Sequence, residues 1–399
     1  MGGSAPWLTI VGLGEDGHAG LSDASRAALK AAEIVMGPPR HLALLPDLPG
    51  QRVAWPVPFA EGLALLDGFA GRRVVVLASG DPFWFGAGSV IARRYPRDAW
   101  RALPGVSVFS LAVAHMGWPL ERVLCLGHHA APLSRLRPHL APGARLIVTL
   151  RDGEAVADLG ACLTGLGFGA SALTVMEALG GPRERITATR ADAVTGGFGH
   201  PVCVAIEVAG EGAVLPCTAG LDDGVFASDG VMTKRPVRAL TLSALAPRPG
   251  ERLWDIGGGS GSVGIEWLLS HPTTEAVTIE PRADRIALIR TNAAALGVDR
   301  LQVVEGKAPD ALAGLPLPQA VFVGGGLSAA LLDHLFASLP PGTRLVANAV
   351  TLASEALLIQ AQAARGGALL RIELSEAAPL GPRRAWKASY PVVQWSVTL

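Results

Sequence analysis

The residues with the clearest chemical potential lie in the stretch LWDIGGGSGSVGIE at 253–266. An apolar run ends in Asp255, glycines follow at alternate positions from 257 to 261, and an amphipathic segment begins at Val263. This order predicts a strand, a tight turn and a helix. Glycine suits such a turn because the backbone bends sharply and a ligand can approach it without meeting a Cβ atom. The next strand, AVTIEP at 276–281, ends in Glu280, whose carboxylate could accept hydrogen bonds from a ribose diol.

This pattern resembles the class I S-adenosylmethionine-dependent methyltransferases more closely than the nicotinamide-dependent enzymes, because an acidic residue stands two positions before the first glycine. The resemblance implies that S-adenosylmethionine lies along the turn, with its ribose at the carboxylate of Glu280. The cofactor-binding residues expected at the ends of the two strands are Asp255, Gly257, Gly258, Gly259, Ser260, Gly261 and Glu280.

A second glycine-rich turn, GLGEDG at 12–17, fits the dinucleotide-binding pattern GxGxxG but lacks its context. The next helix is predicted to begin only near Ser22, a good N-cap, so no helix N-terminus faces the loop. Glu15 and Asp16 would repel a pyrophosphate, and no acidic residue ends the following strand. We therefore expect this loop to pack near a ligand without cradling a phosphate.

The elements that must position these residues alternate between strand-like runs and helical runs rich in alanine and leucine, which predicts an α/β fold. The first unit, residues 1–208, shows two lobes. Strands are expected near 7–12, 33–36, 74–78 and 106–109 in one lobe, and near 145–150, 172–176 and 202–208 in the other.

Residues 209–230 are glycine-rich and lack helical or strand periodicity, so we interpret them as a linker that should tolerate cutting. The second unit, residues 231–399, opens with a predicted helix at 236–245. Its strands are expected near 252–256, 276–280, 301–305, 320–323 and 343–347, with two more near the C-terminus. This order suits the seven-stranded, Rossmann-like sheet of a class I methyltransferase.

The first unit resembles the tetrapyrrole methylase family, which acts on cobalamin precursors, over nearly all of residues 7–208. The resemblance is carried by VLASGDPFWFGAGS at 76–89, PGVSVFSLAVAHMGWP at 104–119, EALGGPRERI at 177–186 and the opening VGLG. In that family S-adenosylmethionine lies folded in a cleft between two lobes. The resemblance implies that Ser79, Gly80 and Asp81 contact its methionine end. The residues implied to line the cofactor are Trp84, Ser107 and Val108.

In the second unit, SDGVMTKRPVRALTL at 228–242 resembles the decarboxylating precorrin-6B methyltransferases. The resemblance implies that Thr233 touches the cofactor and that the adenine lies near Gly306 to Ala308, in VVEGKAPDAL. Asn348 ends a predicted strand at the sheet edge where ligands bind, and it is either a substrate contact or a turn residue. In their order, the two halves match a fused family of cobalamin biosynthesis, the decarboxylating C5,15-methyltransferases.

Composition excludes several classes of function. Lysine plus arginine and aspartate plus glutamate each number 34, so no net charge favours nucleic acid or a membrane surface. No apolar run reaches the roughly 18–20 residues of a membrane span, and MGGSAPWLTIVG lacks the basic region of an export signal. The four cysteines show no CxxC spacing and the nine histidines no HxH or HExxH spacing, so we expect no metal site and a reducing cytoplasm.

The resemblance implies a large reduced tetrapyrrole with acetate and propionate arms as substrate. Two meso carbons, 5 and 15, receive methyl groups, and the ring C acetate at C12 leaves as carbon dioxide, giving precorrin-8. A meso carbon of this kind is already nucleophilic and mainly needs alignment with the sulfonium methyl group. We therefore assign no catalytic acid, base or nucleophile.

A polycarboxylate demands cationic partners, and arginine suits carboxylates best. The candidates in the second unit are Lys234, Arg235, Arg383, Arg384 and Lys387. Such basic runs are more often simply solvated. Other readings stay open: methylation of another tetrapyrrole, or one unit that has lost catalysis and serves for docking. The family resemblance further implies a homo-oligomer with one S-adenosylmethionine in each unit.

Overall fold

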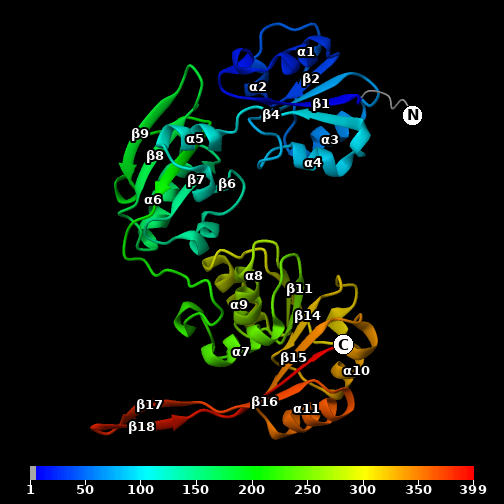
Figure 1. Cartoon of the computed structure of the whole chain (residues 1–399), viewed down its shortest axis with the longest axis vertical. Coiled ribbons are helices and arrows are strands. Elements are labelled where there is room, and N and C mark those ends of the chain that lie inside the picture. The colour runs from blue at the N-terminus through cyan, green and yellow to red at the C-terminus, as the bar shows by residue number, and fades with distance from the viewer. Residues whose placement is uncertain (1–5) are drawn as a thin grey trace. The chain divides into compact units, whose positions relative to one another are not determined.

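The structure, a computed structural model, describes residues 6–399 (Figure 1). The described residues up to Ala213, except Leu133–His139, form one compact unit, and Leu133–His139 with Val214–Leu399 form the second. Both are built from helices packed on parallel or mixed sheets, which confirms the α/β class. Within residues 6–399, no helix combines the length and apolar character needed to cross a membrane. The sequence judged for an export signal lies partly in residues 1–5, outside the described residues.

The first lobe of the first unit is a five-stranded parallel sheet in the order β3-β2-β4-β1-β5. Its central strands are almost wholly apolar because helices cover both faces: α1 and α2 on one, α3 and α4 on the other (Figure 1). The strands are β1 (Leu8–Leu13), β2 (Ile34–Gly37), β3 (Gln51–Ala54), β4 (Val74–Ser79) and β5 (Trp100–Leu103). The helices are α1 (Asp23–Ala31), α2 (Pro39–Ala43), α3 (Phe59–Asp67) and α4 (Gly88–Arg94).

The second lobe is a five-stranded mixed sheet in the order β6-β7-β10-β8-β9, in which only β6 and β7 pair in parallel. Helix α5 packs on it through Phe109 and Ala112. The strands are β6 (Leu124–His128), β7 (Arg145–Leu150), β8 (Ala172–Glu177), β9 (Arg185–Arg190) and β10 (Val202–Glu207), and the helices are α5 (Val108–Met116) and α6 (Ala155–Gly165).

The prediction of a strand at residues 106–109 was wrong. Ser107 is the N-cap of α5, because its Oγ accepts a hydrogen bond from the Ser110 amide (3.1 Å), and the strand lies earlier, at β5. Strands β3, β5, β6 and β9 were not foreseen. Each lies at an edge of its sheet and is only partly buried, so its apolar pattern is weak.

The second unit contains the expected seven-stranded sheet, in the order β13-β12-β11-β14-β15-β19-β16. The first five strands in this order, from β13 to β15, are parallel to one another. Strand β19 pairs antiparallel with both β15 and β16. Its strands are β11 (Arg252–Ile256), β12 (Glu275–Glu280), β13 (Gln302–Glu305), β14 (Ala320–Val323), β15 (Arg344–Ala349), β16 (Ala368–Ile372) and β19 (Val392–Thr398). Its helices are α7 (Arg235–Leu245), α8 (Ser262–Ser270), α9 (Ala283–Ala295), α10 (Ala329–Ser338) and α11 (Leu352–Arg365).

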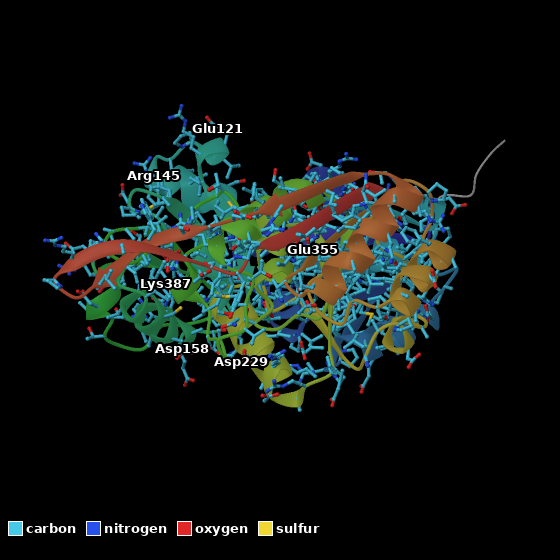
Figure 2. The ribbon with its side chains drawn as sticks, turned by 90° about the horizontal axis from the view of Figure 1, so that it is seen from below. Glu121, Arg145, Asp158, Asp229, Glu355 and Lys387 are labelled. Atoms are coloured by element: carbon cyan, nitrogen blue, oxygen red, sulfur yellow. The ribbon has the colours of Figure 1, made fainter. Side chains whose placement is uncertain are left out.

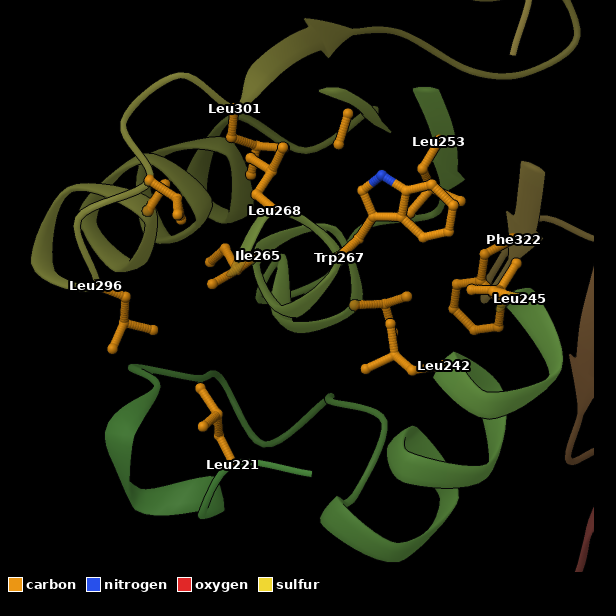
Figure 3. Packing of buried hydrophobic residues seen from close by; sticks show 14 of the residues in the cluster. Leu221, Leu242, Leu245, Leu253, Ile265, Trp267, Leu268, Leu296, Leu301 and Phe322 are labelled. Carbon is orange, nitrogen blue, oxygen red and sulfur yellow. The ribbon is translucent and has the colours of Figure 1, made fainter. Parts of the chain in front are cut away.

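Part of the segment interpreted as a linker belongs to the core of the second unit. Leu215, Leu221 and Phe226 are 8%, 2% and 6% exposed and pack in the cluster formed by α7, α8, α9 and the sheet. Figure 3 shows Leu221 on the same side of this cluster as Leu242 of α7. Apolar side chains fix this segment without any periodic pattern, which is why its sequence gave no sign of the packing.

The C-terminal region contains four strands where two were expected. Between β16 and β19 the chain forms a two-stranded antiparallel hairpin of β17 (Ser375–Leu380) and β18 (Arg383–Ala388). This hairpin is a separate sheet and extends as an arm from the second unit (Figure 1). Its side chains are mostly exposed, including Trp386 at 77%.

Candidate cofactor sites

In the second unit, the turn from β11 to α8 needs glycine at two places. Gly257 has a φ of 75°, and a Cβ built there would lie 2.6 Å from the Cα of Gly325 at the end of β14. Gly261 has a φ of 77° and is the N-cap of α8. The Gly257 amide donates to the carbonyl of Ile279 (2.9 Å), which fixes the turn to β12. The backbone of the turn therefore packs tightly against the segment after β14 and is bonded to β12. It lies at the carboxyl ends of adjacent parallel strands, where open α/β sheets bind ligands.

Asp255 lies beneath this turn and is 1% exposed. Its Oδ2 accepts hydrogen bonds from the Gly264 amide (3.1 Å) and the Thr278 hydroxyl (3.3 Å), so it joins β11 to α8 and β12. Burial raises the pKa of Asp255 to about 7, although the two hydrogen bonds oppose the rise. This carboxyl group supports the turn from below.

Glu280, at the end of β12, is 2% exposed. Its carboxylate accepts hydrogen bonds from the amides of Gly259 (3.0 Å) and Arg282 (3.2 Å), and its own carbonyl accepts from the Gly306 amide (3.2 Å). The structure thus brings Glu280 together with the glycine turn and with the adenine position expected at Gly306. Ala308, which precedes Pro309 in the chain, is half-buried. Ser260, within the turn, is 2% exposed, and its hydroxyl has no hydrogen-bond partner among residues 6–399.

Residues 220–233, here called the strap, run from the domain connection to the start of α7 and pass the glycine turn. The Val231 carbonyl oxygen lies 3.3 Å from the position of a Cβ built on Gly259. Thr233, expected to touch the cofactor, ends the strap, and its carbonyl accepts a hydrogen bond from the Arg238 guanidinium (2.6 Å). Thr233 is half-buried and follows, by two residues, the Val231 carbonyl that faces Gly259.

Sequence reasoning missed Asn292, which joins the strap to the turn. Its side chain in α9 is 2% exposed. It accepts from the Ala227 amide (2.8 Å) and donates to the carbonyls of Ala227 and Ser260, both at 2.9 Å. The available signal was an uncharged polar residue within the largely apolar run IALIRTNAAALG at 286–297, which requires a hydrogen-bond partner once it is buried.

In the first unit, a cavity of about 450 Å3 lies between the two lobes. All six residues expected at the first cofactor site line it: Ser79, Gly80, Asp81, Trp84, Ser107 and Val108. They come from the end of β4, the loop after it and the start of α5. The structure therefore brings together residues that are separated by almost thirty positions in the chain.

The backbone at this cavity is closely packed. Gly80 has a φ of 51°, its amide donates to the Leu13 carbonyl (3.0 Å), and its carbonyl accepts from the Gly105 amide (3.0 Å). A Cβ on Gly12 would lie 1.9 Å from the Gly80 carbonyl oxygen. Gly12, which began the dinucleotide-like pattern, is thus required for packing between strand ends. Asp81 accepts from the Phe83 amide (2.8 Å), and the ring of Trp84 lies 4.9 Å from that of Phe109.

The basic residues proposed for the substrate do not form one group. Arg383, Arg384 and Lys387 are exposed on β18 of the hairpin arm, and Figure 2 labels Lys387 there. Lys234 and Arg235 lie at the start of α7, where they approach Asp223 (4.0 Å) and Asp222 (3.9 Å). They directly follow Thr233 in the chain.

Asn348 is neither a turn residue nor free. It lies within β15, where its Nδ2 donates to the Thr241 hydroxyl and its Oδ1 accepts from Gln394, both at 3.0 Å. Gln394 also donates to Thr241 (3.0 Å). The three side chains form a polar link between α7, β15 and β19, which gives Asn348 a structural role whether or not it contacts a substrate.

Comparison with known proteins places both units in methyltransferase families. The family of Tetrapyrrole (Corrin/Porphyrin) Methylases matches residues 7–195, and the Precorrin methyltransferase domain matches residues 224–399. The precorrin-6Y C(5,15)-methyltransferase (decarboxylating) of Sinorhizobium sp is 50% identical over 399 residues, which cover 99% of this chain and 97% of the relative.

Two shorter proteins match part of the chain. The cobalt-precorrin-6B C(15)-methyltransferase (decarboxylating) of Salmonella typhimurium is 34% identical over 167 residues, 40% of this chain and 85% of the relative. The crystal structure of the C-terminal domain of precorrin-6Y C5,15-methyltransferase from Rhodobacter capsulatus is 57% identical and covers 46% of this chain and 100% of that chain, with a TM-score of 0.45. From the full-length match, the chain belongs to the family of decarboxylating precorrin-6Y C(5,15)-methyltransferases.

Proposed function

We propose that this protein transfers two methyl groups from S-adenosylmethionine to meso carbons 5 and 15 of precorrin-6B, or of its cobalt analogue, and decarboxylates the acetate at C12 to give precorrin-8. The observation that carries the proposal is the end-to-end match, at 50% identity, to a relative named for both methylations and the decarboxylation. Two separate sites, one in each unit, support it, because each lies where its fold family binds this cofactor.

The chemistry asks for little from ionisable side chains. In each methylation the meso carbon attacks the sulfonium methyl group, S-adenosylhomocysteine leaves, and the ring system later releases a proton. In the decarboxylation the bond to the carboxyl carbon breaks, carbon dioxide departs, and the electron pair enters the conjugated macrocycle, where a proton is taken up. The protein must hold the partners in line, and such alignment can supply several kcal/mol of the barrier.

The second unit is proposed to act at carbon 15 and to decarboxylate, and the first unit at carbon 5. The Salmonella relative is named for C15 methylation and decarboxylation together, and it matches only 40% of this chain, about the size of one unit. Both of those activities therefore fit within one unit, and the stretch around Thr233 resembles that type of enzyme.

The boundary between the units is proposed to lie close to residues 213 and 214, earlier than the linker end at 230. Support comes from the packing of Leu215, Leu221 and Phe226 into the second core. The four free cysteines support a reducing, cytoplasmic setting. Exposed Leu369 and Leu370 on the edge strand β16 support self-association into a homo-oligomer.

The direct test of this function uses S-adenosylmethionine with isotopically labelled methyl groups and purified full-length protein. Precorrin-6B should gain two labelled methyl groups and lose one carboxyl group. A chain that binds the cofactor but labels a different tetrapyrrole and leaves precorrin-6B unchanged would contradict the proposed substrate.

A further inference from the structure

The cavity between the two lobes of the first unit, here called the cleft, is lined by one side chain with a permanent positive charge among the described residues. Among the residues that line it within the described chain, Arg40 is the only arginine or lysine. His41 also lines the cleft, but burial, followed by the charge of Arg40, lowers its pKa to about 3, so its imidazole is neutral at neutral pH. Arg40 is therefore the guanidinium that an anionic group entering this cleft could meet.

The guanidinium of Arg40 is held from two sides. Its Nη1 donates to Glu15 Oε1 (2.6 Å) and its Nη2 donates to the hydroxyl of Ser79 (2.7 Å). The second oxygen of Glu15 accepts from Arg183 (3.1 Å), which comes from the other lobe of the unit. The Glu15 side chain is 11% exposed, whereas that of Arg40 is 34% exposed. Arg40 is thus fixed in orientation while part of it stays open.

The hydrogen-bond donors of Arg40 are only partly used. Arg40 and Arg183 share the carboxylate of Glu15, while Asp81, the other carboxylate in the described lining, accepts from the Phe83 amide. Both carboxylate oxygens of Glu15, which was expected from sequence to repel a pyrophosphate, are paired with arginines in the structure. A guanidinium offers five N–H donors, and the bonds to Glu15 and Ser79 occupy only two of them. Free donors in a fixed fork suit bidentate binding of a carboxylate.

We propose that Arg40 binds a carboxylate group of a ligand in the first-unit cleft, with Glu15 as the side chain that orients it. The proposal rests on the proposed function, which supplies two carboxylates of the same chemistry. One is the methionine carboxylate of S-adenosylmethionine, favoured by the bond from Arg40 to Ser79. The other is an acetate or propionate arm of the tetrapyrrole, favoured by the open part of the Arg40 side chain.

The test uses the full-length protein and two probes that need no turnover. S-adenosylhomocysteine carries the methionine carboxylate, and uroporphyrin carries acetate and propionate arms on a macrocycle. Each is titrated into wild type, Arg40→Gln, Arg40→Lys and Glu15→Gln. The matched control is Arg94→Gln, which removes an arginine–aspartate pair from α4, outside the cleft lining.

If the carboxylate belongs to the substrate, Arg40→Gln weakens uroporphyrin binding by about tenfold or more and leaves S-adenosylhomocysteine binding unchanged. If it belongs to the cofactor, one class of S-adenosylhomocysteine sites weakens by about as much and uroporphyrin binding is unchanged. Arg40→Lys gives an intermediate loss in either case, because it keeps the charge but not the fork. Glu15→Gln should lose less than Arg40→Gln, because the glutamine side chain keeps an acceptor oxygen that can still orient the Arg40 guanidinium.

Unchanged binding of both probes by a folded Arg40→Gln protein would overturn the proposal. An equal loss in Glu15→Gln would also overturn it, because the ion pair would then act only on structure. If Arg40→Gln fails to fold, the same comparison is made with Arg40→Lys, and wild-type affinity for both probes would again contradict the proposal. A wild-type protein that binds both probes but transfers no methyl group would contradict the proposed function and leave the role of Arg40 intact.

Discussion

At the scale of single residues, the second site depends on two carboxyl groups with different tasks. Asp255 is wholly enclosed and supports the turn from below, whereas Glu280 reaches the amide of Gly259 from the end of the next strand. Both oxygens of Glu280 already accept backbone hydrogen bonds, and each can accept another from a ribose hydroxyl. Glu280 therefore shapes the turn as well as offering acceptors to a ligand.

Replacing Glu280 tests this double role. Glu280→Ala should weaken S-adenosylhomocysteine binding at the second site by about 1–3 kcal/mol, because charge-assisted hydrogen bonds to both the turn and the ribose are lost. Calorimetry is done in a full-length chain that also carries Gly80→Val, so that only the second site is titrated. Glu280→Gln, which keeps one acceptor oxygen, should lose less. Unchanged affinity in Glu280→Ala would rule out a ribose contact.

Asp255 predicts a defined pH dependence. Its pKa is about 7 in the folded chain against 3.8 for the ordinary group, so between these values the folded protein holds a proton that the unfolded chain has released. The stabilisation that Asp255 gives the folded state is therefore fully present below about pH 4 and is lost as the pH rises through 7. In urea unfolding, the stability of wild type relative to Asp255→Asn should be lower at pH 8 than at pH 5. An equal difference at both pH values would contradict the raised pKa.

At the scale of elements, the strap is held by a buried ion pair. Arg238 of α7 is 0% exposed and contacts Glu266 of α8, the Leu221 carbonyl and the Thr233 carbonyl. Glu266 also accepts from the amides of Gly220 (2.6 Å) and Leu221 (2.9 Å). Glu266 of α8 thus holds the first end of the strap, and Arg238 of α7, which pairs with Glu266, holds the Thr233 end.

Removal of one partner should be costly. Glu266→Gln removes the buried carboxylate and leaves Arg238 paired only with the partly exposed Asp223 (3.0 Å). It should lower the free energy of unfolding of the second unit by about 3 kcal/mol. The matched control is Glu373→Gln, which breaks the exposed pair with Arg371 and should cost less than about 1 kcal/mol. Similar losses in both variants, measured by urea unfolding of the full-length protein, would show that the buried pair contributes nothing special.

The elements themselves were predictable to different degrees. The glycine turn, Asp255 and Glu280 could be placed from sequence because a strand, a turn and a helix leave local patterns. The strap could not, since Leu221 and Phe226 are isolated apolar residues whose partners lie far along the chain. Arg40 and Asn292 were missed for the same reason. Their roles depend on contacts with Glu15, Ser79, Ala227 and Ser260, which only the folded arrangement brings together.

At the scale of the whole molecule, the chain consists of two compact units, and residues from Val214 onward, within the glycine-rich segment, group with the second unit. A second unit that begins at Val231 would lack Leu215, Leu221 and Phe226 from its core, together with the amides bound by Glu266. The first residue of the shortest fragment that still folds therefore marks where the second unit begins.

Two divisions of the chain test this. A second unit beginning at Val214 should be folded and show a cooperative unfolding transition. One beginning at Val231 should be unstable or insoluble, because the core cluster is incomplete. Circular dichroism and thermal unfolding of the two fragments give the comparison. A fragment from Val231 that is as stable as the longer one would show that residues 214–230 are a true linker.

Two independent methyl-transfer sites in one chain should respond separately when either is blocked, and the masses of the products test this most directly. Full-length wild type, Gly80→Val and Gly257→Val are each incubated with precorrin-6B and S-adenosylmethionine. Wild type should yield a product with two added methyl groups and one lost carbon dioxide. Gly80→Val should retain one methylation and the decarboxylation, and Gly257→Val should lose the decarboxylation and the methylation linked to it. Loss of both methylations in each folded variant would contradict the account, because a single site shared by the two units would then perform the whole reaction.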